Sequence, residues 1–461
     1  MHLPGLERKL LDLIILVLWL GIVAALVRLK LHQLSFLAND PAFGLYGLLT
    51  TSYLLFRLLC LLFYHPVYHP APGRPAQRVG RVAGAEEGEG EGEREGEGTC
   101  DFYPSVTIII PTMNEEKAIF RTIEACCRLD YPSDLLKVIV INDGSTDGTW
   151  REITRAMDVF PQVEAVNWTV NRGKRAGMVE GIRRSQSEII VFIDSDSVVE
   201  PDSLKVLVRP FVDPNVAAVV GHADVLNKDR NLLTRMQAVR YFISFRIIKA
   251  SESVFNSVTC CSGCYSAYRR NAVLEVLNEW QNQTFLGKKC TFGDDRSLTN
   301  LLLREGYSLL YASEARVKTI VPETWRGYLK QQLRWKKSWF RENLIAVTHM
   351  WRRNPGASIP YYLSVLFAFC SPLVLVRSLV LNAASRWAYL GGLAILGALY
   401  GLYYRLHRRD GLWPYAFAFV FLNAFIFSWQ IYQAILTSTD TSWGTRQVRQ
   451  ALNPKAVEAE H

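Results

Sequence analysis

Five stretches of about 20 mostly apolar residues constrain the fold of this chain more than any other feature of its sequence. An α-helix of this length crosses the hydrocarbon core of a bilayer. The first stretch is too long for the apolar region of a signal peptide and has no small-residue cleavage site, so we expect it to be retained. The sequence therefore predicts an integral, multi-pass protein of the cell membrane. The stretches are Leu10 to Leu29, Phe43 to Tyr64, Pro360 to Ala383, Trp387 to Leu406 and Trp413 to Leu436.

Basic residues beside these stretches predict their orientation. Arg8 and Lys9 precede the first one, and Arg74, Arg78 and Arg81 follow the second. Because basic residues flank the cytoplasmic ends of membrane spans, both ends of this hairpin should be cytoplasmic. The large polar middle of the chain then lies in the cytoplasm. The nine cysteines occur partly as adjacent pairs and do not form a spread framework, which agrees with a reducing compartment.

The net charge of +9 bears on the partners of the chain. The run from Gly84 to Gly98 holds seven Glu and one Arg, so the remainder carries about +15. A basic balance is typical of proteins that bind nucleic acid, anionic lipid or an anionic small molecule. No nucleic-acid-binding module is visible in the sequence. We therefore expect a membrane surface and a phosphate-bearing substrate as partners, and no nucleic acid.

Composition divides the chain into segments. The Gly/Glu-rich run has no apolar side chains to bury and predicts a disordered linker. Beyond it, the run "SVTIIIP" marks the start of a folded domain. We expect a transmembrane hairpin at 1–66, the linker at 67–103, a cytoplasmic catalytic domain at 104–325, interface helices at 326–353, transmembrane and interface helices at 354–437, and a C-terminal segment and tail at 438–461.

The polar middle alternates apolar strand patterns with helical patterns. The strand patterns are "SVTIIIP", "KVIVIND" and "EIIVFIDSDS", and helical patterns from Glu115 to Leu129 and from Arg175 to Ser185 separate them. Strands that are apolar throughout and alternate with helices predict an α/β fold with a mostly parallel sheet covered on both faces. Ligands of such sheets bind beyond the carboxyl ends of the strands.

Polar residues follow each of the three predicted strands and form a candidate site. Two aspartates one residue apart, such as Asp194 and Asp196, can share a divalent cation with diphosphate oxygens. Asp143 can accept hydrogen bonds from a nucleobase or ribose. Lys174 and Arg175 open a helix whose N-terminus favours an anion. This set suits a nucleoside diphosphate that bears a transferable group. The residues after the first strand are Thr112, Asn114 and Glu115.

The order of motifs resembles that of processive family-2 glycosyltransferases with a GT-A fold. It runs from Asp143 through Asp194-x-Asp196 and Asp295 to Gln331-x-x-Arg334-Trp335, and the resemblance covers roughly Val106 to Arg446. Within that group, "NQTFLGKKCTFGDDRSLTN", "LLTRMQAVRY" and "YLKQQLRWKKSWFRE" are similar to segments of hyaluronan synthases, and "SWGTR" resembles their gating loop. The segment "CCSGCYSAYRR" is closer to chitin-oligosaccharide synthases, and Ser197 stands where both groups usually have threonine.

The resemblance implies roles for the catalytic residues. Asp295, next to Asp294, would act as the general base that deprotonates the acceptor hydroxyl. Asp196, with Asp194, would hold Mg²⁺ or Mn²⁺ against the diphosphate of a UDP-sugar. Inversion at the donor carbon would then give a β-linkage.

Further residues would bind the substrates by the same resemblance. Arg334 would pair with a phosphate, Trp335 would stack on the acceptor sugar, and Gln331 belongs to the same motif. An amphipathic interface helix also explains this motif. Cys290 would line the donor pocket, or it is a buried structural cysteine. Trp443 and Arg446 would close over the nucleotide, or they belong to a plain tail.

The resemblance favours a membrane-embedded synthase that polymerises hyaluronan from UDP-GlcNAc and UDP-glucuronic acid and passes the growing polysaccharide through the bilayer. One alternative is a chitin or chitin-oligosaccharide synthase that uses UDP-GlcNAc alone. Another is an inactive membrane receptor or transporter with a nucleotide-sugar-like domain.

The topology of the last apolar stretch needs a separate interpretation. Five crossings from a cytoplasmic start would place "SWGTR" outside the cell, where it could not reach UDP. We therefore expect part of the stretch from Trp413 to Leu436 to be an interface helix. The stretch from Leu232 to Phe255, apolar with interspersed basic residues, also predicts a helix that lies on the inner leaflet.

Overall fold

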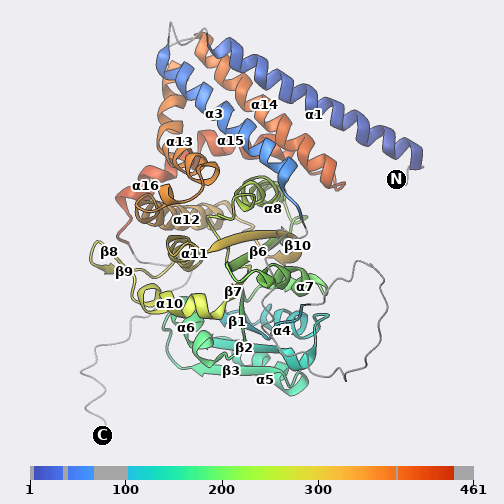
Figure 1. Cartoon of the computed structure of the whole chain (residues 1–461), viewed down its shortest axis with the longest axis vertical. Helices are drawn as coiled ribbons and strands as arrows, with labels where there is room; N and C mark the ends of the chain where they lie inside the picture. The colour runs from blue at the N-terminus through green and yellow to red at the C-terminus, as the bar shows by residue number, and fades with distance from the viewer. Residues whose placement is uncertain (1–4, 35–39, 67–101, 381–382, 441–461) are drawn as a thin grey trace, which may run out of the picture.

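The computed structural model describes residues 5–34, 40–66, 102–380 and 383–440. Figure 1 shows long helices packed together at one end of the molecule and an α/β domain at the other, with α8 and α12 between them. The predicted linker lies almost wholly outside the described residues, and so do Trp443 and Arg446.

The α/β domain is built on an eight-stranded sheet with the order β3-β2-β1-β4-β7-β6-β10-β5. The pairs β1/β2, β2/β3, β1/β4 and β6/β10 are parallel, whereas β7 is antiparallel to both β4 and β6, and β5 is antiparallel to β10. The prediction of a mostly parallel α/β sheet is therefore confirmed. The strands are β1 (Val106–Thr112), β2 (Leu136–Asp143), β3 (Val163–Trp168), β4 (Ile189–Ile193), β5 (Ser197–Val199), β6 (Val216–Val225), β7 (Tyr265–Arg269) and β10 (Ser308–Thr319).

The central strands are buried along their whole length because helices cover both faces of the sheet. Every residue of β1 and β4 is buried, which explains their continuous apolar sequences. The covering helices bring amphipathic faces to this core. They are α4 (Ile119–Cys127), α5 (Thr149–Val159), α6 (Lys174–Arg184), α7 (Ser203–Val208), α10 (Arg270–Gln281) and α11 (Asp294–Arg304). A short hairpin, β8 (Thr284–Phe285) with β9 (Lys288–Lys289), precedes α11.

Two helical segments lie between the sheet and the apolar helices (Figure 1). The first begins with α8 (Leu232–Ile243), where Asn231 caps the helix by accepting from the Thr234 N–H. It continues through a π-helical turn (Ser244–Lys249) into α9 (Ala250–Ser253). The second is α12 (Trp325–Ala346), which carries the Gln331-x-x-Arg334-Trp335 motif. The helix predicted from the apolar and basic pattern over residues 232–255 is thus present.

Three helices of the described chain are long and apolar enough to cross a membrane: Pro41–Phe63, Pro355–Val380 and Tyr415–Leu436. The first predicted stretch lies in α1 (Gly5–Gln33), which is apolar over the shorter run Leu13–Arg28, and the fourth forms α14 (Ala383–His407). The remaining apolar helices are α3 (Pro41–Cys60), which ends in a 3₁₀ turn, and α13 (Pro355–Val380).

The last apolar stretch is broken in the middle. Helix α15 (Tyr415–Phe425) ends at Ile426, whose φ of −122° interrupts the helix. A 3₁₀ turn (Phe427–Trp429) and α16 (Gln430–Leu436) follow, and Gln430 donates to the backbone oxygen of Leu329 on α12 at 3.1 Å. The second half of this stretch therefore packs against α12, and its position at the membrane interface stays a prediction.

Candidate active site

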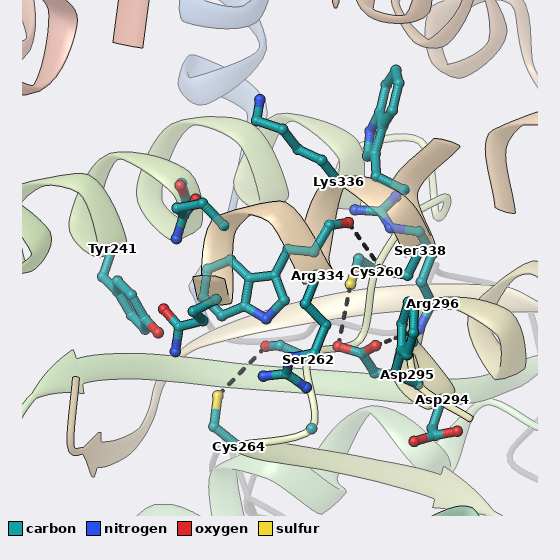
Figure 2. A pocket seen from close by; sticks show the side chains of 18 of the residues that line it. Tyr241, Cys260, Ser262, Cys264, Asp294, Asp295, Arg296, Arg334, Lys336 and Ser338 are labelled. Carbon is teal, nitrogen blue, oxygen red and sulfur yellow. Dashed lines mark hydrogen bonds between the residues drawn. The ribbon is translucent and has the colours of Figure 1, made fainter. Parts of the chain in front are cut away.

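A cavity of about 710 Å³ opens between the carboxyl edge of the sheet and the helices above it. Its floor contains Pro111 at the end of β1 and the Asp194–Asp196 segment that follows β4. Its walls come from α8 and the π-helical turn, the segment 259–264, the start of α11, and α12. Figure 2 shows Arg334 reaching from α12 toward Ser262, above the start of α11. Topology thus brings together residues that lie far apart in the sequence.

The residues predicted after β1 and β2 lie at the edge of the sheet, beside the cavity and outside its lining. Asn114, held at φ 56°, accepts from the Thr146 N–H at 2.8 Å, and the Glu115 N–H donates to Thr149 at 2.7 Å. Asp143 accepts from the backbone N–H groups of Arg172 (2.6 Å) and Gly173 (2.9 Å). These bonds fix the loops around the edge of the sheet.

Thr112 adds a buried hydroxyl at this edge. Its side chain is buried, and its hydroxyl oxygen has no hydrogen-bond partner among the described residues. A buried polar atom without a partner is costly and marks a place where a ligand or water can bond.

The Asp194–Asp196 pair forms an acidic floor to the cavity. The Lys174 ammonium pairs with Asp194. Burial, together with the charges of Asp194 and Glu115, raises the pKa of Asp196 to about 7. Crowded carboxylates of this kind are stabilised by a cation.

These carboxylates fit a divalent cation that a substrate helps to hold. Oxygen donors are what Mg²⁺ and Mn²⁺ prefer, and Mg²⁺ is commonly bound by one or two carboxylates plus substrate phosphates. Within the described ranges, no three His, Cys, Asp or Glu side chains are grouped to hold a metal. Asp194 and Asp196 would therefore hold the cation together with ligand oxygens.

Arg175 and Asp294 form a buried ion pair. The Arg175 Nε donates to Asp294 Oδ1 at 2.6 Å, and the same guanidinium bonds the Trp280 backbone oxygen at 2.8 Å. Both side chains are less than a tenth exposed. The sequence predicted that Arg175 binds substrate, but Arg175 does not line the cavity. Its bond to Asp294 instead positions the start of α11.

Asp295 faces the cavity from the first turn of α11 (Figure 2). Its Oδ1 accepts from the Arg296 N–H at 2.8 Å, and its Oδ2 lies 3.7 Å from the Cys260 sulfur. Asp295 is therefore accessible to a substrate hydroxyl in the cavity. Asp294, in contrast, is held by its ion pair with Arg175.

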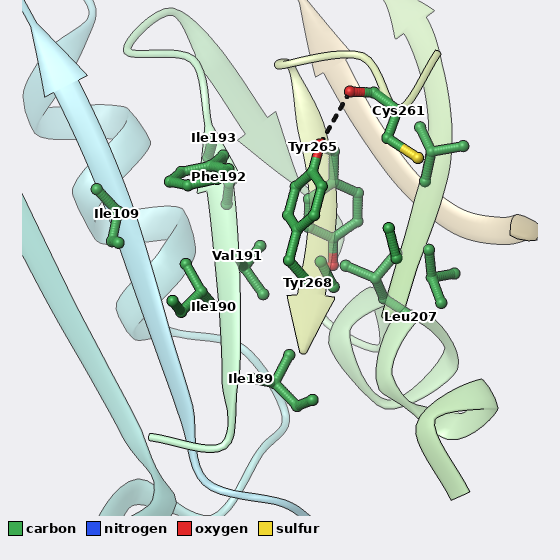
Figure 3. Packing of buried hydrophobic residues seen from close by; sticks show 14 of the residues in the cluster. Ile109, Ile189, Ile190, Val191, Phe192, Ile193, Leu207, Cys261, Tyr265 and Tyr268 are labelled. Carbon is green, nitrogen blue, oxygen red and sulfur yellow. Dashed lines mark hydrogen bonds between the residues drawn. The ribbon is translucent and has the colours of Figure 1, made fainter. Parts of the chain in front are cut away.

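The loop that carries Cys260 is anchored to the core of the sheet. The Tyr268 hydroxyl donates to the Cys261 backbone oxygen at 3.2 Å (Figure 3), and Thr299 on α11 accepts from the Cys261 N–H at 2.9 Å. The Lys249 ammonium bonds the Cys260 backbone oxygen. Contacts from β7, α11 and the π-helical turn thus fix the position of the segment 259–264.

The motif on α12 faces the cavity through Gln331, Arg334 and Trp335. The Arg240 guanidinium lies 5.4 Å from the centre of the Trp335 ring, which fixes the ring by a cation–π contact. The Gln331 side-chain oxygen is buried without a partner among the described residues, so it is available to accept a hydrogen bond from a ligand or water.

Cys290 lies outside the main cavity. It is buried in a small crevice between the β8–β9 hairpin, Arg341 and residues 438–440. Asp440 pairs with Lys337 on α12 at 2.8 Å. The described chain ends there, immediately before the segment that contains Trp443 and Arg446.

Several lining residues were not predicted from the sequence: Arg240, Lys249, Glu252, Cys260 and Lys336. A signal for Arg240 and Lys249 was present in the sequence, because the basic residues of 232–255 form the pattern that predicts a helix on the inner leaflet. The neighbouring basic residues Lys337 and Arg341 of α12 bond Asp440 and the Phe292 backbone oxygen.

Comparison with known proteins identifies this arrangement. Residues 104–338 match the family described as "Glycosyltransferase like family 2", which is more than half of the chain. The chain belongs to glycosyltransferase family 2. It is an enzyme of the glycosyltransferase class, so the alternative of an inactive receptor or transporter is wrong.

Relatives extend the match beyond this domain. A hyaluronan synthase of Streptococcus pyogenes is 28% identical over 92% of this chain and 95% of its own length. An N-acetylglucosaminyltransferase of Azorhizobium caulinodans is 31% identical over 75% of this chain and 88% of its own.

A solved structure supports the predicted fold. The mannosyltransferase of Pyrobaculum calidifontis in complex with GDP-Man and Mn²⁺ covers 83% of this chain and 99% of its own, with a TM-score of 0.52 and 19% identity. The fold of the catalytic domain is therefore GT-A, and helices able to cross a membrane are joined to it. A glycosyltransferase of this fold uses a nucleotide-sugar donor and a sugar acceptor.

Proposed function

We propose that this protein is a membrane-embedded, inverting, processive synthase that polymerises hyaluronan from UDP-GlcNAc and UDP-glucuronic acid and translocates the product. The shape of the cavity carries this proposal. Asp196 and Asp295 line its lower part, and Ser364 of α13 and Asn423 of α15 line it among the apolar helices. A chain extended at Asp295 would therefore have a path through the cavity toward the apolar helices. Similarity to the streptococcal synthase over 92% of the chain supports hyaluronan as the product.

The reaction is one displacement at the donor sugar. Asp295 takes the proton from the acceptor hydroxyl, whose oxygen attacks C1 of the donor while the bond from C1 to the UDP oxygen breaks. Attack opposite the leaving group inverts C1 and gives a β-linkage. Arg334 pairs with the diphosphate, and Trp335 presents its ring to the acceptor sugar. Mg²⁺ or Mn²⁺ held by Asp196 and Asp194 would neutralise charge on the departing UDP.

The proposal includes a cytoplasmic catalytic domain at 104–325 in a multi-pass protein. Basic residues around the first two spans support this orientation. The break after α15, which turns α16 along α12, supports a C-terminus on the same side as the site.

A second product is also supported by a specific observation. The relative from Azorhizobium is an N-acetylglucosaminyltransferase at 31% identity, and "CCSGCYSAYRR", whose first part lines the cavity, resembles the chitin-oligosaccharide group. In this alternative the enzyme joins GlcNAc units from UDP-GlcNAc alone.

UDP release by the purified full chain in detergent separates the two products. We expect sustained release with Mn²⁺ or Mg²⁺ only when UDP-GlcNAc and UDP-glucuronic acid are both present. Asp295→Asn should lower the rate by at least about 10²-fold, because the general base is lost. Sustained release with UDP-GlcNAc alone, unchanged by UDP-glucuronic acid, would establish the alternative product.

A further inference from the structure

The wall of the cavity formed by α8 and α12 carries cations and no acid. Arg240 lines it from α8, and Arg334 and Lys336 line it from α12. All the acidic lining residues stand elsewhere, on the sheet edge, α9 and the start of α11. The two sides of the cavity therefore differ in charge, and the upper wall is suited to an anionic ligand.

Three of the five acids that line the opposite side of the cavity are paired with other basic side chains. Asp194 pairs with Lys174, Asp294 pairs with Arg175, and Glu252 pairs with Arg57. Within the described part of the chain, Lys336 makes no hydrogen bond or ion pair. Figure 2 shows Lys336 extending away from Asp294 and Asp295. Its charge is thus not balanced by the catalytic carboxylates.

Arg240 lies near Lys336 and beside the Trp335 ring. Its Nη1 donates to the Tyr328 hydroxyl at 3.1 Å, which leaves its remaining N–H groups for another partner. Burial and the positive charge of Arg240 lower the pKa of Lys336 to about 8. Two poorly solvated cations close together are unfavourable unless an anion binds between them.

We propose that Lys336 and Arg240 bind the carboxylate of an acidic sugar unit in the acceptor chain, next to the unit that lies on Trp335. The inference rests on the proposed function and deepens it, because it assigns the preference for an acidic polymer to two side chains. A neutral polymer would leave both cations without an anionic partner in the filled site. Guanidinium and ammonium groups together suit a carboxylate, the first by paired hydrogen bonds and the second as a point charge.

Binding of two oligosaccharides to the full chain in detergent tests this site. The probes are a hyaluronan tetrasaccharide and the neutral chitin tetrasaccharide, followed by quenching of tryptophan fluorescence at one fixed salt concentration. We expect the acidic probe to bind at least about fivefold more tightly, and Lys336→Gln to reduce this preference below about twofold. Arg240→Gln should act in the same direction, and Lys336→Arg should keep the preference.

Lys330→Gln is the matched control, because Lys330 lies on the same helix but is exposed and does not line the cavity. It should keep the preference of the wild type. Equal binding of both probes to the wild type, or an unchanged preference in Lys336→Gln, would overturn the inference. UDP is the third probe. If Lys336→Gln weakens UDP binding by the same factor as binding of the acidic tetrasaccharide, the cations serve the diphosphate and the inference fails.

The two proposals fail in different ways. If UDP-glucuronic acid is consumed but the acidic probe has no advantage, the assignment of Lys336 and Arg240 is wrong while the proposed product stands. If UDP-glucuronic acid is not consumed, the proposed product falls and this inference falls with it.

Discussion

At the scale of single residues, the adjacent carboxylates Asp294 and Asp295 have different surroundings. Asp295 faces the cavity beside Cys260, whereas Asp294 accepts a 2.6 Å hydrogen bond from the buried guanidinium of Arg175. The repulsion between neighbouring carboxylates is thus offset by an arginine that lies 119 positions away in the sequence. Asp294 is thus held in a structural ion pair, while Asp295 has no ion-pair partner among the described residues and faces the cavity.

This arrangement predicts that Arg175→Met destabilises the fold by about 3–5 kcal/mol, because Asp294 is left as an unpaired buried charge. Thermal unfolding in detergent measures the loss. Arg151→Met is the control, since Arg151 pairs with Glu116 at 3.0 Å but is 72% exposed and should cost at most about 1 kcal/mol. An equal loss in both variants would contradict the buried pair.

At the scale of elements, α11 and α12 meet at Gly293. This glycine precedes α11 at φ 82°, and a Cβ there would lie 2.4 Å from Cβ of Ser338 on α12. Gly293→Ala should push apart the helices that carry Asp295 and Arg334, and a misplacement of about 1 Å lowers the rate by about 10²-fold. UDP release measures the effect. Gly306→Ala, at φ 91° with no atom within 4 Å of its Cβ, imposes similar backbone strain without the clash. Similar rates in both variants would show that the contact is unimportant.

The sequence predicted the elements whose local residue pattern is enough to define them. It did not predict the elements that form only through contacts with residues far away in the chain. The apolar runs of β1, β2 and β4 are continuous because both faces are buried, so these strands and the polar residues at their ends were predictable. Strand β7, with the sequence YSAYR, has no such run and is held between β4 and β6 by tertiary pairing. The role of Arg175 was missed for the same reason, because a local pattern cannot show which side chain a helix terminus will meet.

At the scale of the whole molecule, a buried ion pair joins an apolar helix to the catalytic site. Arg57 of α3 lies 3.6 Å from Glu252 of α9 and donates to Ser251 at 2.9 Å. Glu252 also accepts from the N–H of Thr259 at 3.0 Å, next to the Cys260 that touches Asp295. A shift of α3 relative to the catalytic domain would therefore reach Asp295, the proposed general base, through the Glu252 carboxylate.

Replacing both partners tests whether this carboxylate serves stability, catalysis or both. Glu252→Leu alone should cost about 3–5 kcal/mol, because the buried cation of Arg57 loses its anionic partner. Arg57→Leu with Glu252→Leu should regain most of that stability, since apolar side chains can replace a buried pair. UDP release should nevertheless stay at least about tenfold low in the double variant, because Thr259 has lost its acceptor beside Asp295.

Glu314→Leu is the control, since Glu314 is 39% exposed, pairs with Arg246 and Arg316, and should change the stability by at most about 1 kcal/mol. Recovery of turnover together with stability would mean that Glu252 only neutralises Arg57, whereas recovery of stability alone would make Glu252 a positioning residue for the base.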